Sequence, residues 1–134
     1  MKHVTFFVLI FFTLAFASCN NDNSEDVIAT LAPVPIEFAG KTNPLGADGA
    51  AAGAGVFKST CESCHGPRGH GDGAAGQSLD PKPRNLAEFQ GTAGDDYLFW
   101  RIYSGKPGTS MVGWNGVLTD EQIWQVVSFI RTLK

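Results

Sequence analysis

Two cysteines three positions apart, followed directly by a histidine, constrain this chain more than any other stretch. The segment reads Cys61-Glu62-Ser63-Cys64-His65. Positions i and i+3 lie on the same face of a helical turn, so both thiols can add to the two vinyl groups of one haem. The imidazole of His65 can then bind the haem iron. The pattern therefore predicts one covalently attached haem c, bound through Cys61 and Cys64.

Other uses of a Cys-x-x-Cys pair match the sequence less well. A thioredoxin-like disulfide lies within a βαβ pattern, and no such pattern surrounds Cys61. A zinc site needs two further ligands, and the remaining candidates are Cys19, His3 and His70. Two of these candidates lie at the extreme N-terminus, which weakens the zinc alternative.

The N-terminus is typical of an exported protein. Residues 4–17 form an apolar run that is short for a membrane span and has the length of a signal-peptide core. The run ends in Phe16-Ala17-Ser18-Cys19, which resembles the processing site of bacterial lipoproteins. We predict a lipoprotein signal peptide over residues 1–18 and a lipidated Cys19 on the periplasmic or extracytoplasmic face of a bacterial cell membrane. An ordinary secretory signal and an uncleaved anchor are the alternatives.

The charge balance argues against nucleic acid as a partner. The chain has 10 basic and 13 acidic side chains and a formal net charge of −3, and removal of residues 1–18 with Lys2 makes it −4. Binding to phosphates needs a basic patch. The acidic balance instead predicts a redox partner that presents a positive surface.

Residues 19–47 are predicted to form a tether that follows the lipidated cysteine. The segment begins with polar and acidic residues and contains Pro33, Pro35 and Pro44, which exclude a long helix. A coil of this length would hold a small domain at a membrane surface. As an alternative, the apolar residues 34–38 pack on the domain or on a partner subunit. The folded domain is expected over residues 48–134.

A first helix is predicted from an N-cap at Asp48 to about Cys61. Gly53 and Phe57 lie four positions apart and share a face of this helix. Glycine inside a helix costs about 1 kcal/mol relative to alanine, so its presence suggests that another element approaches closely. We expect the last helix of the chain to pack against Gly53 and Phe57.

Two more helices follow from their end signals. Residues 95–104 have acids in the first turn and Gly105 just past the end. The last helix begins with a capping box formed by Thr119 and Gln122. One of its faces is apolar, with Ile123, Val126, Val127, Ile130 and Leu133.

A stiff, proline-containing segment over residues 80–86 is expected beside the haem. The carbonyl of Pro81 or Pro83 is predicted to accept a hydrogen bond from the second ring nitrogen of His65, which would orient that ligand. Arg84 either pairs with a haem propionate or lies on a solvated surface. Trp114 is also assigned to the haem pocket.

Met111 is predicted to be the second axial ligand of the iron. It follows His65 by 46 positions in a loop rich in glycine and proline, which can cross the other face of the haem. A thioether is a usual partner of histidine in haem proteins that carry electrons. A lone methionine also fills gaps in cores. His70 is a rival ligand, but it lies only five positions from His65.

These residues together resemble the monohaem class I cytochrome c family over residues 48–134. The resemblance is carried by Gly53 and Phe57, the Cys-x-x-Cys-His segment, Gly108-Thr109-Ser110-Met111 and the closing helix. It implies an all-α fold of three to five helices whose first and last helices cross near a right angle. It also implies low-spin haem iron bound by His65 and Met111, and one-electron transfer.

The resemblance further implies an electron-transfer protein that is not itself an enzyme, in a bacterial respiratory or photosynthetic chain. The lipoprotein signal, the tether and residues 35–45 are similar to the small monohaem lipoprotein subunit of alternative complex III. That similarity implies a subunit of a quinol-oxidising complex, with redox proteins and the membrane as partners. The alternatives are an independent tethered carrier that serves a terminal oxidase or reductase, and an open-site haem enzyme or sensor.

Overall fold

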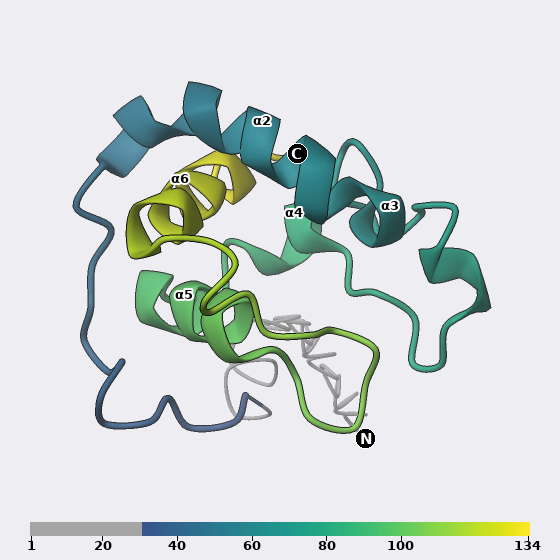
Figure 1. Ribbon diagram of the computed structural model, residues 1–134, viewed down its shortest axis with the longest axis horizontal. Coiled ribbons are helices and arrows are strands. Elements are labelled where there is room, and N and C mark those ends of the chain that lie inside the picture. Colours follow the sequence, from purple (N-terminus) through teal and green to yellow (C-terminus); the bar gives the residue numbers. More distant parts are fainter. Residues whose placement is uncertain (1–30) are drawn as a thin grey trace, which may run out of the picture.

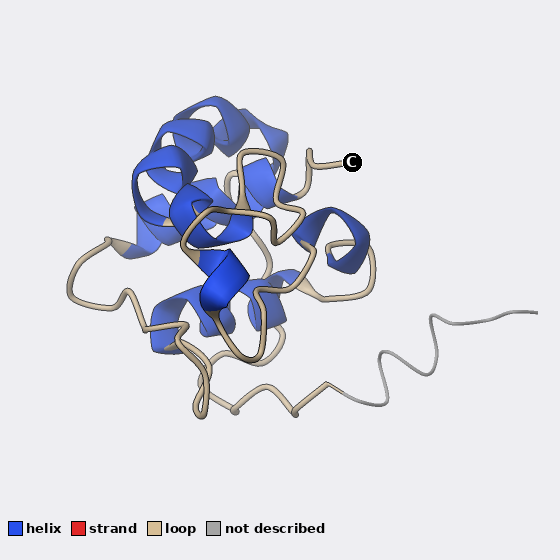
Figure 2. Ribbon diagram, turned by 90° about the vertical axis from the view of Figure 1, so that its right-hand side faces the viewer, coloured by secondary structure: helices blue, strands red, loops and turns tan. Residues whose placement is uncertain are grey.

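A computed structural model describes residues 31–134 of the chain, and the predicted signal peptide and lipidated Cys19 lie outside this range. Within it the chain forms five α-helices and no strand (Figures 1 and 2). No helix in the described range is both long and apolar enough to cross a bilayer. The helices are α2 (Ala50–Thr60), α3 (Glu62–His65), α4 (Leu86–Phe89), α5 (Asp95–Ser104) and α6 (Asp120–Ile130), with 3₁₀ turns η1 (Gly46–Gly49) and η2 (Gly76–Ser78).

Helix α2 lies across α6, and this contact is the most extensive between any two elements (Figure 1). Gly53 is buried at the crossing, where a Cβ would overlap the Gln125 carbonyl oxygen and lie 3.1 Å from the Phe129 Cβ. The Phe57 and Phe129 rings meet beside it with centroids 5.0 Å apart. The predicted packing of the last helix against Gly53 and Phe57 is therefore observed.

The start of α2 differs from the sequence prediction. The N-cap is Gly49, without a side-chain cap, and Asp48 lies in η1. The physical reason is that the chain is already wound into a 3₁₀ turn before α2 begins, so Asp48 lacks the extended backbone of an N-cap residue. The packing of Gly49 explains why this position is a glycine, since a Cβ there would lie 2.7 Å from the Ser128 Oγ.

The other helix ends agree with their signals. Helix α5 runs over Asp95–Ser104 and is followed by Gly105 with a φ of 73°. At the start of α6, Thr119 and Gln122 form both bonds of the capping box. The apolar face of α6 is buried in the core, where Ile123, Val126 and Val127 are fully enclosed.

Of the segment predicted as a tether, residues 31–47 lie on the domain and form a strap along α5 and α6 (Figure 1). Phe38 is buried, with its ring 6.1 Å from the Phe99 ring and 5.3 Å from the Tyr103 ring. The Asn43 side-chain amide donates to the Ser128 hydroxyl at 2.8 Å, and that hydroxyl donates to the Gly46 carbonyl at 2.6 Å. Packing on the domain, the alternative for residues 34–38, is thus the arrangement observed at Phe38.

Replacing Asn43 with alanine is expected to loosen this strap. The side chain also donates to the Trp124 carbonyl and accepts from the Leu45 amide, so its removal leaves partly buried groups without partners. We expect the free energy of unfolding in urea to fall by about 1–3 kcal/mol and tryptic cleavage after Lys41 to become faster. Thr42→Ala is the matched control, because Thr42 is exposed and its side chain makes no hydrogen bond within residues 31–134. Equal behaviour of the two variants would contradict the prediction.

Candidate haem-binding site

A cavity of about 390 Å³ brings the predicted haem residues together. Its size is within the range of small-molecule sites. Of the residues predicted from the sequence, it is lined by Cys61, Cys64, His65, Met111, Pro81, Pro83, Arg84 and Trp114. His70 does not line it, and its Nε2 instead lies 3.2 Å from the Lys134 carbonyl oxygen. The rival axial ligand is therefore outside the cavity.

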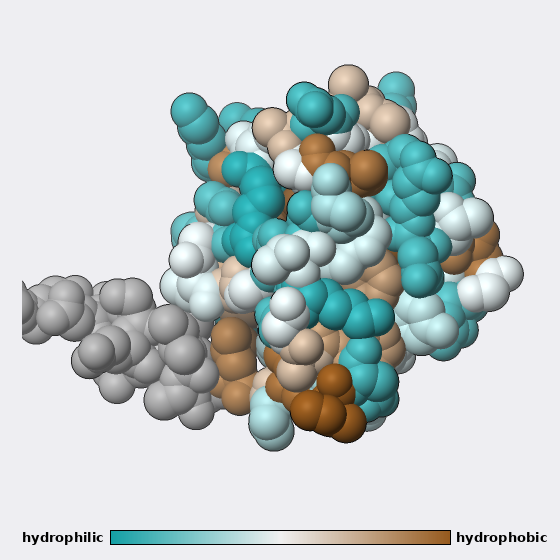
Figure 3. Space-filling view, turned by 90° about the vertical axis from the view of Figure 1, so that its left-hand side faces the viewer, coloured by the Kyte–Doolittle hydropathy of each residue, from teal (hydrophilic) through white to brown (hydrophobic). Residues whose placement is uncertain are grey.

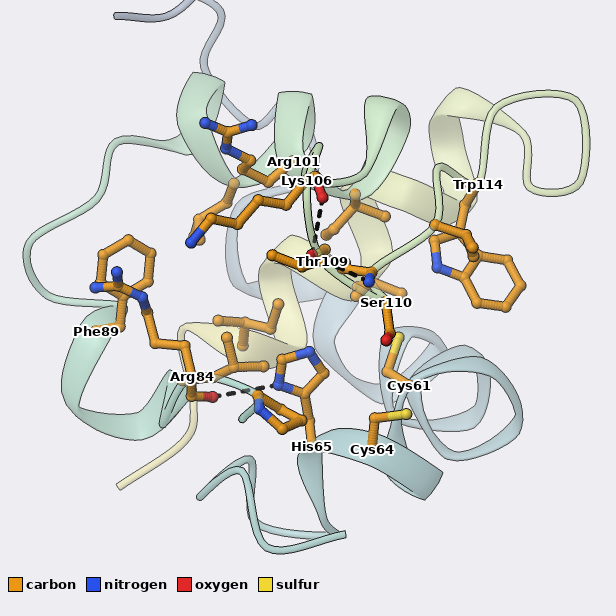
Figure 4. Close-up of a pocket in the computed structure, with 18 of the residues that line it drawn as sticks. Cys61, Cys64, His65, Arg84, Phe89, Arg101, Lys106, Thr109, Ser110 and Trp114 are labelled. Atoms are coloured by element: carbon orange, nitrogen blue, oxygen red, sulfur yellow. Dashed lines mark hydrogen bonds between the residues drawn. The ribbon is translucent and has the colours of Figure 1, made fainter. Parts of the chain in front are cut away.

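The two cysteines are placed by the junction of α2 and α3. Cys61 follows the last residue of α2, and the amides of Cys64 and His65 both donate to its carbonyl, at 3.2 and 2.9 Å. This single turn directs both sulfur atoms to the same side of the cavity, as Figure 4 shows. The prediction that the i, i+3 spacing places both thiols on the same side is therefore confirmed.

The glycine-rich loop after His65 folds back beneath α3 and supports it. The Gly71 amide donates to the His65 carbonyl at 2.8 Å, and the Gly73 amide donates to the Cys64 carbonyl at 3.2 Å. A Cβ at Gly73 would overlap the Ser63 carbonyl oxygen, so this close approach requires glycine. The composition predicted only a loop, because the supporting contact joins two backbones and leaves no side-chain pattern.

The predicted partner of the His65 ring is corrected by the structure. Its Nδ1 lies 3.2 Å from the Arg84 carbonyl oxygen, and not from that of Pro81 or Pro83 (Figure 4). The Pro83 carbonyl is turned instead toward Gly71, where a Cβ would overlap it. A carbonyl oxygen can only accept, so the proton is on Nδ1 and the Nε2 lone pair is free for a metal.

Burial changes the acidity of two groups in the cavity of the free protein. Burial lowers the pKa of His65, and the hydrogen bond to the Arg84 carbonyl raises it by a smaller amount. Burial raises the pKa of the Cys61 thiol, which the Thr60 hydroxyl lowers in part and Cys64 raises further. A neutral imidazole is the form that binds iron.

Met111 lies in a loop that is closed by its own hydrogen bonds. The Lys106 amide donates to the Met111 carbonyl at 3.0 Å, and the Met111 amide donates to the Thr109 hydroxyl at 3.2 Å. The Thr109 hydroxyl in turn donates to the Lys106 carbonyl at 2.8 Å. Figure 4 shows Thr109 and Ser110 across the cavity from His65. The loop therefore places a thioether in the same cavity as the imidazole.

Helix α4 forms part of the cavity through Leu86 and Phe89, and the sequence analysis did not predict it. The segment predicted to be extended has no helix over residues 80–85, and α4 begins at its last residue. Asn85 is its N-cap, and its side-chain oxygen accepts from the Ala87 and Glu88 amides at 3.0 and 3.3 Å. The asparagine was the available signal, but a helix of four residues has no periodicity to confirm it. The Phe89 ring at the end of α4 lies against the Arg84 guanidinium, 4.3 Å from its carbon.

The residues around the cavity suit haem c. Haem has two vinyl groups toward one side of its ring and two propionates toward the other. Figure 4 shows the cysteine sulfurs on one side of the cavity and the Arg84 and Lys106 side chains on the opposite side. The wall between them is largely apolar and suits a flat macrocycle, with Phe57, Leu98, Ile102, Val126 and Ile130.

A curated protein and a solved structure that are similar to this domain are both named as cytochromes c. Cytochrome c55X of Stutzerimonas stutzeri is 36% identical over 70 residues, which are 50% of this chain and 52% of that protein. The match thus spans about half the length of that curated relative. The solved KustC0563 c-type cytochrome is 26% identical with a TM-score of 0.52, over 61% of this chain and 96% of that one.

The fold also occurs in the reducing HAO-like protein complex Kustc0457/Kustc0458 of Kuenenia stuttgartiensis. The identity is 21% and the TM-score 0.61, over 81% of this chain and 55% of that one, which shows a shared fold alone. The family model described as "Cytochrome C oxidase, cbb3-type, subunit III" matches residues 48–130. Because this match covers more than half of the chain, the protein belongs to that family and has an all-α cytochrome c domain, for which the family implies haem c.

Proposed function

We propose that this protein transfers single electrons through one haem c, attached at Cys61 and Cys64, with His65 and Met111 as axial ligands. Proteins of the cytochrome c family are electron carriers, which supports the general function. The observation that carries the specific proposal is that one cavity is lined by two thiols, a thioether and an imidazole whose Nε2 is free. In this proposal the protein is not itself an enzyme.

The haem would supply the one-electron ferric/ferrous couple. Cys61 and Cys64 would hold it by thioether bonds, which prevent its loss outside the cell. The Arg84 carbonyl keeps the Nδ1 proton on His65 and so orients Nε2. The closed loop around Thr109 restrains Met111. A methionine ligand and an apolar wall both favour the less charged ferrous state and raise the potential.

Arg84 and Lys106 would hold the propionates. Both line the cavity on the side away from the cysteine sulfurs (Figure 4). The Arg84 guanidinium carbon lies 4.3 Å from the centre of the Phe89 ring, a cation–π contact that favours this position of the side chain. Guanidinium and ammonium groups both form strong, charge-assisted bonds with carboxylates.

We further propose that the protein is anchored by a lipid at Cys19, at the outer face of a bacterial membrane, as a subunit of a respiratory complex. The apolar run before Cys19 and the polar segment after it support export and anchoring. The family description names a subunit of an oxidase, which supports a place in a membrane complex. The alternative function, an independent tethered carrier that serves a terminal oxidase or reductase, would use the same haem site.

Absorption spectroscopy of the haem-loaded protein tests the ligation. We expect a low-spin spectrum in both oxidation states, a near-infrared sulfur-to-iron band in the ferric state, and no change of the ferrous spectrum with carbon monoxide. A six-coordinate iron leaves carbon monoxide no open position. A high-spin ferrous spectrum that responds to carbon monoxide would overturn the proposal and favour an open-site enzyme or sensor.

A further inference from the structure

One turn of the strap holds a large apolar side chain out to solvent. Ile36 is 90% exposed, which makes it the most exposed large hydrophobic side chain within residues 31–134. Its neighbour Phe38 is buried, and the amides of Phe38 and Ala39 both donate to the Pro35 carbonyl at 2.9 Å. These bonds close the turn, so a hydrogen-bonded backbone directs Ile36 outward.

Further contacts hold this turn on the domain. The Gly40 amide donates to the Asp96 carboxylate at 2.9 Å, and the Lys41 ammonium nitrogen lies 5.4 Å from the centre of the Phe38 ring. The exposure of Ile36 is therefore a property of the folded domain. A single exposed apolar residue is common on protein surfaces, so other observations must show what it contacts.

The strap lacks the acidic excess of the chain. Residues 31–47 contain one acid, Glu37, and one base, Lys41, so their charges cancel, whereas the whole chain has a formal net charge of −3. Figure 3 shows the side of the molecule on which the strap lies, with strongly hydrophobic surface at its lower edge. A surface that is apolar and carries no net negative charge can approach a bilayer with anionic headgroups.

A groove beside the start of the strap has side chains that suit a membrane interface. Ala32 lines this groove together with Trp100 and Arg101. The Arg101 guanidinium carbon lies 3.8 Å from the centre of the half-buried Trp100 ring. Tryptophan is enriched at the boundary between headgroups and acyl chains, and arginine binds phosphate groups. The groove therefore adds groups that suit lipid headgroups to the apolar turn that follows it in the chain.

The predicted lipid anchor brings this surface close to a membrane. Residues 20–30 separate the predicted lipidated Cys19 from the strap. A chain of this length has an end-to-end distance of about 20 Å as a coil, whereas a compact domain of about 100 residues is roughly 30–35 Å across. The side of the domain on which the strap begins therefore stays nearest to the bilayer.

We propose that the strap docks on the phospholipid bilayer that holds the lipid of Cys19. The turn inserts Ile36 at the boundary between headgroups and acyl chains, and the groove with Trp100 and Arg101 lies on the headgroups. The inference rests on the anchoring that is part of the proposed function. A partner subunit is the competing ligand, and the short connection between Cys19 and the strap favours the bilayer.

Docking through the strap would orient the haem. Ala32 shares its groove with Arg101 and Lys106, which Figure 4 shows on the side of the haem cavity opposite the sulfurs of Cys61 and Cys64. The thioether side of the haem would then face away from the bilayer. The anchored domain would present one defined side to proteins in solution.

The test measures how fast a water-soluble maleimide alkylates a cysteine beside Ile36 in the haem-loaded, lipidated protein. Ala39→Cys supplies this cysteine, because Ala39 is exposed in the same turn. The reference is the same variant with Cys19→Ser, which has no anchor. On vesicles of phosphatidylethanolamine and phosphatidylglycerol, we expect the anchored protein to react about tenfold more slowly, because burial of an isoleucine side chain favours the docked state by about that factor.

Ala52→Cys is the matched control for the labelled position. Ala52 is exposed on α2, which lies at the top of Figure 1, whereas the first part of the strap lies at the bottom. Its alkylation should be equally fast with and without the anchor. In the Ala39→Cys protein, Ile36→Ser should remove the protection and Ile36→Leu should keep it. Since Ile36 is exposed, neither change disturbs the core, and the haem spectrum should stay unchanged.

Four outcomes would overturn the inference. They are equal rates for anchored and anchor-free Ala39→Cys, equal protection at Ala52→Cys, protection that survives Ile36→Ser, and protection in native membranes but not on vesicles. The last outcome would assign the strap to a partner subunit.

The mass of the purified wild-type protein separates this inference from the proposed function. A lipid on Cys19 without protection at Ala39→Cys would leave the anchoring intact and overturn the docking alone. A protein without lipid on Cys19 would remove the proposed anchoring, and the docking with it.

Discussion

Met111→Ala is expected to abolish the near-infrared sulfur-to-iron band completely and to open the ferrous iron to carbon monoxide. Within the cavity lining, Met111 is the single methionine, and the other candidate, His70, lies outside it. The variant should keep its covalent haem, because Cys61, Cys64 and His65 are unchanged. Its reduction potential should fall, since a thioether ligand favours the ferrous state.

Ser110→Ala is the matched control for this variant. Ser110 is the preceding residue and also lines the cavity, but its side chain makes no hydrogen bond within residues 31–134. Its spectrum should equal that of the wild type. Retention of the sulfur-to-iron band in Met111→Ala would contradict the assignment of the ligand. A low-spin wild-type spectrum without that band, with an iron that carbon monoxide reaches in His70→Ala and not in Met111→Ala, would transfer the assignment to His70.

Gly53→Ala is expected to lower the free energy of unfolding by at least about 3 kcal/mol, the upper end of the range for overpacked cores. The added Cβ would overlap the Gln125 carbonyl oxygen, which belongs to the backbone of α6 and cannot rotate away. The two helices would have to separate, and α2 leads directly into the haem attachment segment. Urea denaturation of the haem-loaded protein, followed by circular dichroism, gives the measurement.

Gly55→Ala makes the same chemical change two residues later on α2, but it should raise the free energy of unfolding instead of lowering it. Gly55 is exposed, and apart from its chain neighbours and the backbone of α2 itself, no atom lies within 4 Å of the place where its Cβ would be. Alanine is favoured over glycine in a helix by about 0.5–1 kcal/mol, so this variant should be more stable by that amount. Similar losses in both variants would show that helix packing at Gly53 is not the cause.

The long helices were predictable because their signals are local. The capping box at Thr119 and the glycine after Ser104 lie within a few residues of the ends that they mark. The packing of α2 on α6 was also predictable, since a glycine and a phenylalanine one turn apart mark a close contact. Helix α4 was missed because four residues are too few for a periodic pattern.

The contacts that depend on distant segments could not be derived from the sequence. The sequence correctly indicated that a carbonyl of the proline-containing segment would bind the His65 ring, but it pointed to Pro81 or Pro83. In the structure the carbonyl is that of Arg84. Adjacent carbonyls of an extended segment point in different directions, and only the path of the chain past α3 decides which one meets the imidazole.

The sequence by itself determined the helical class and identified the thiols and the imidazole that line the cavity, because residue types, their spacing and helix end signals lie in neighbouring residues. It also predicted that Met111 belongs to this site, and Met111 lines the cavity. The short helix α4 was not predicted. The tertiary structure alone decided that residues 31–47 lie on the domain and that four cations gather at the cavity of an acidic chain. Both features arise between residues far apart in the chain, and composition averages over such arrangements.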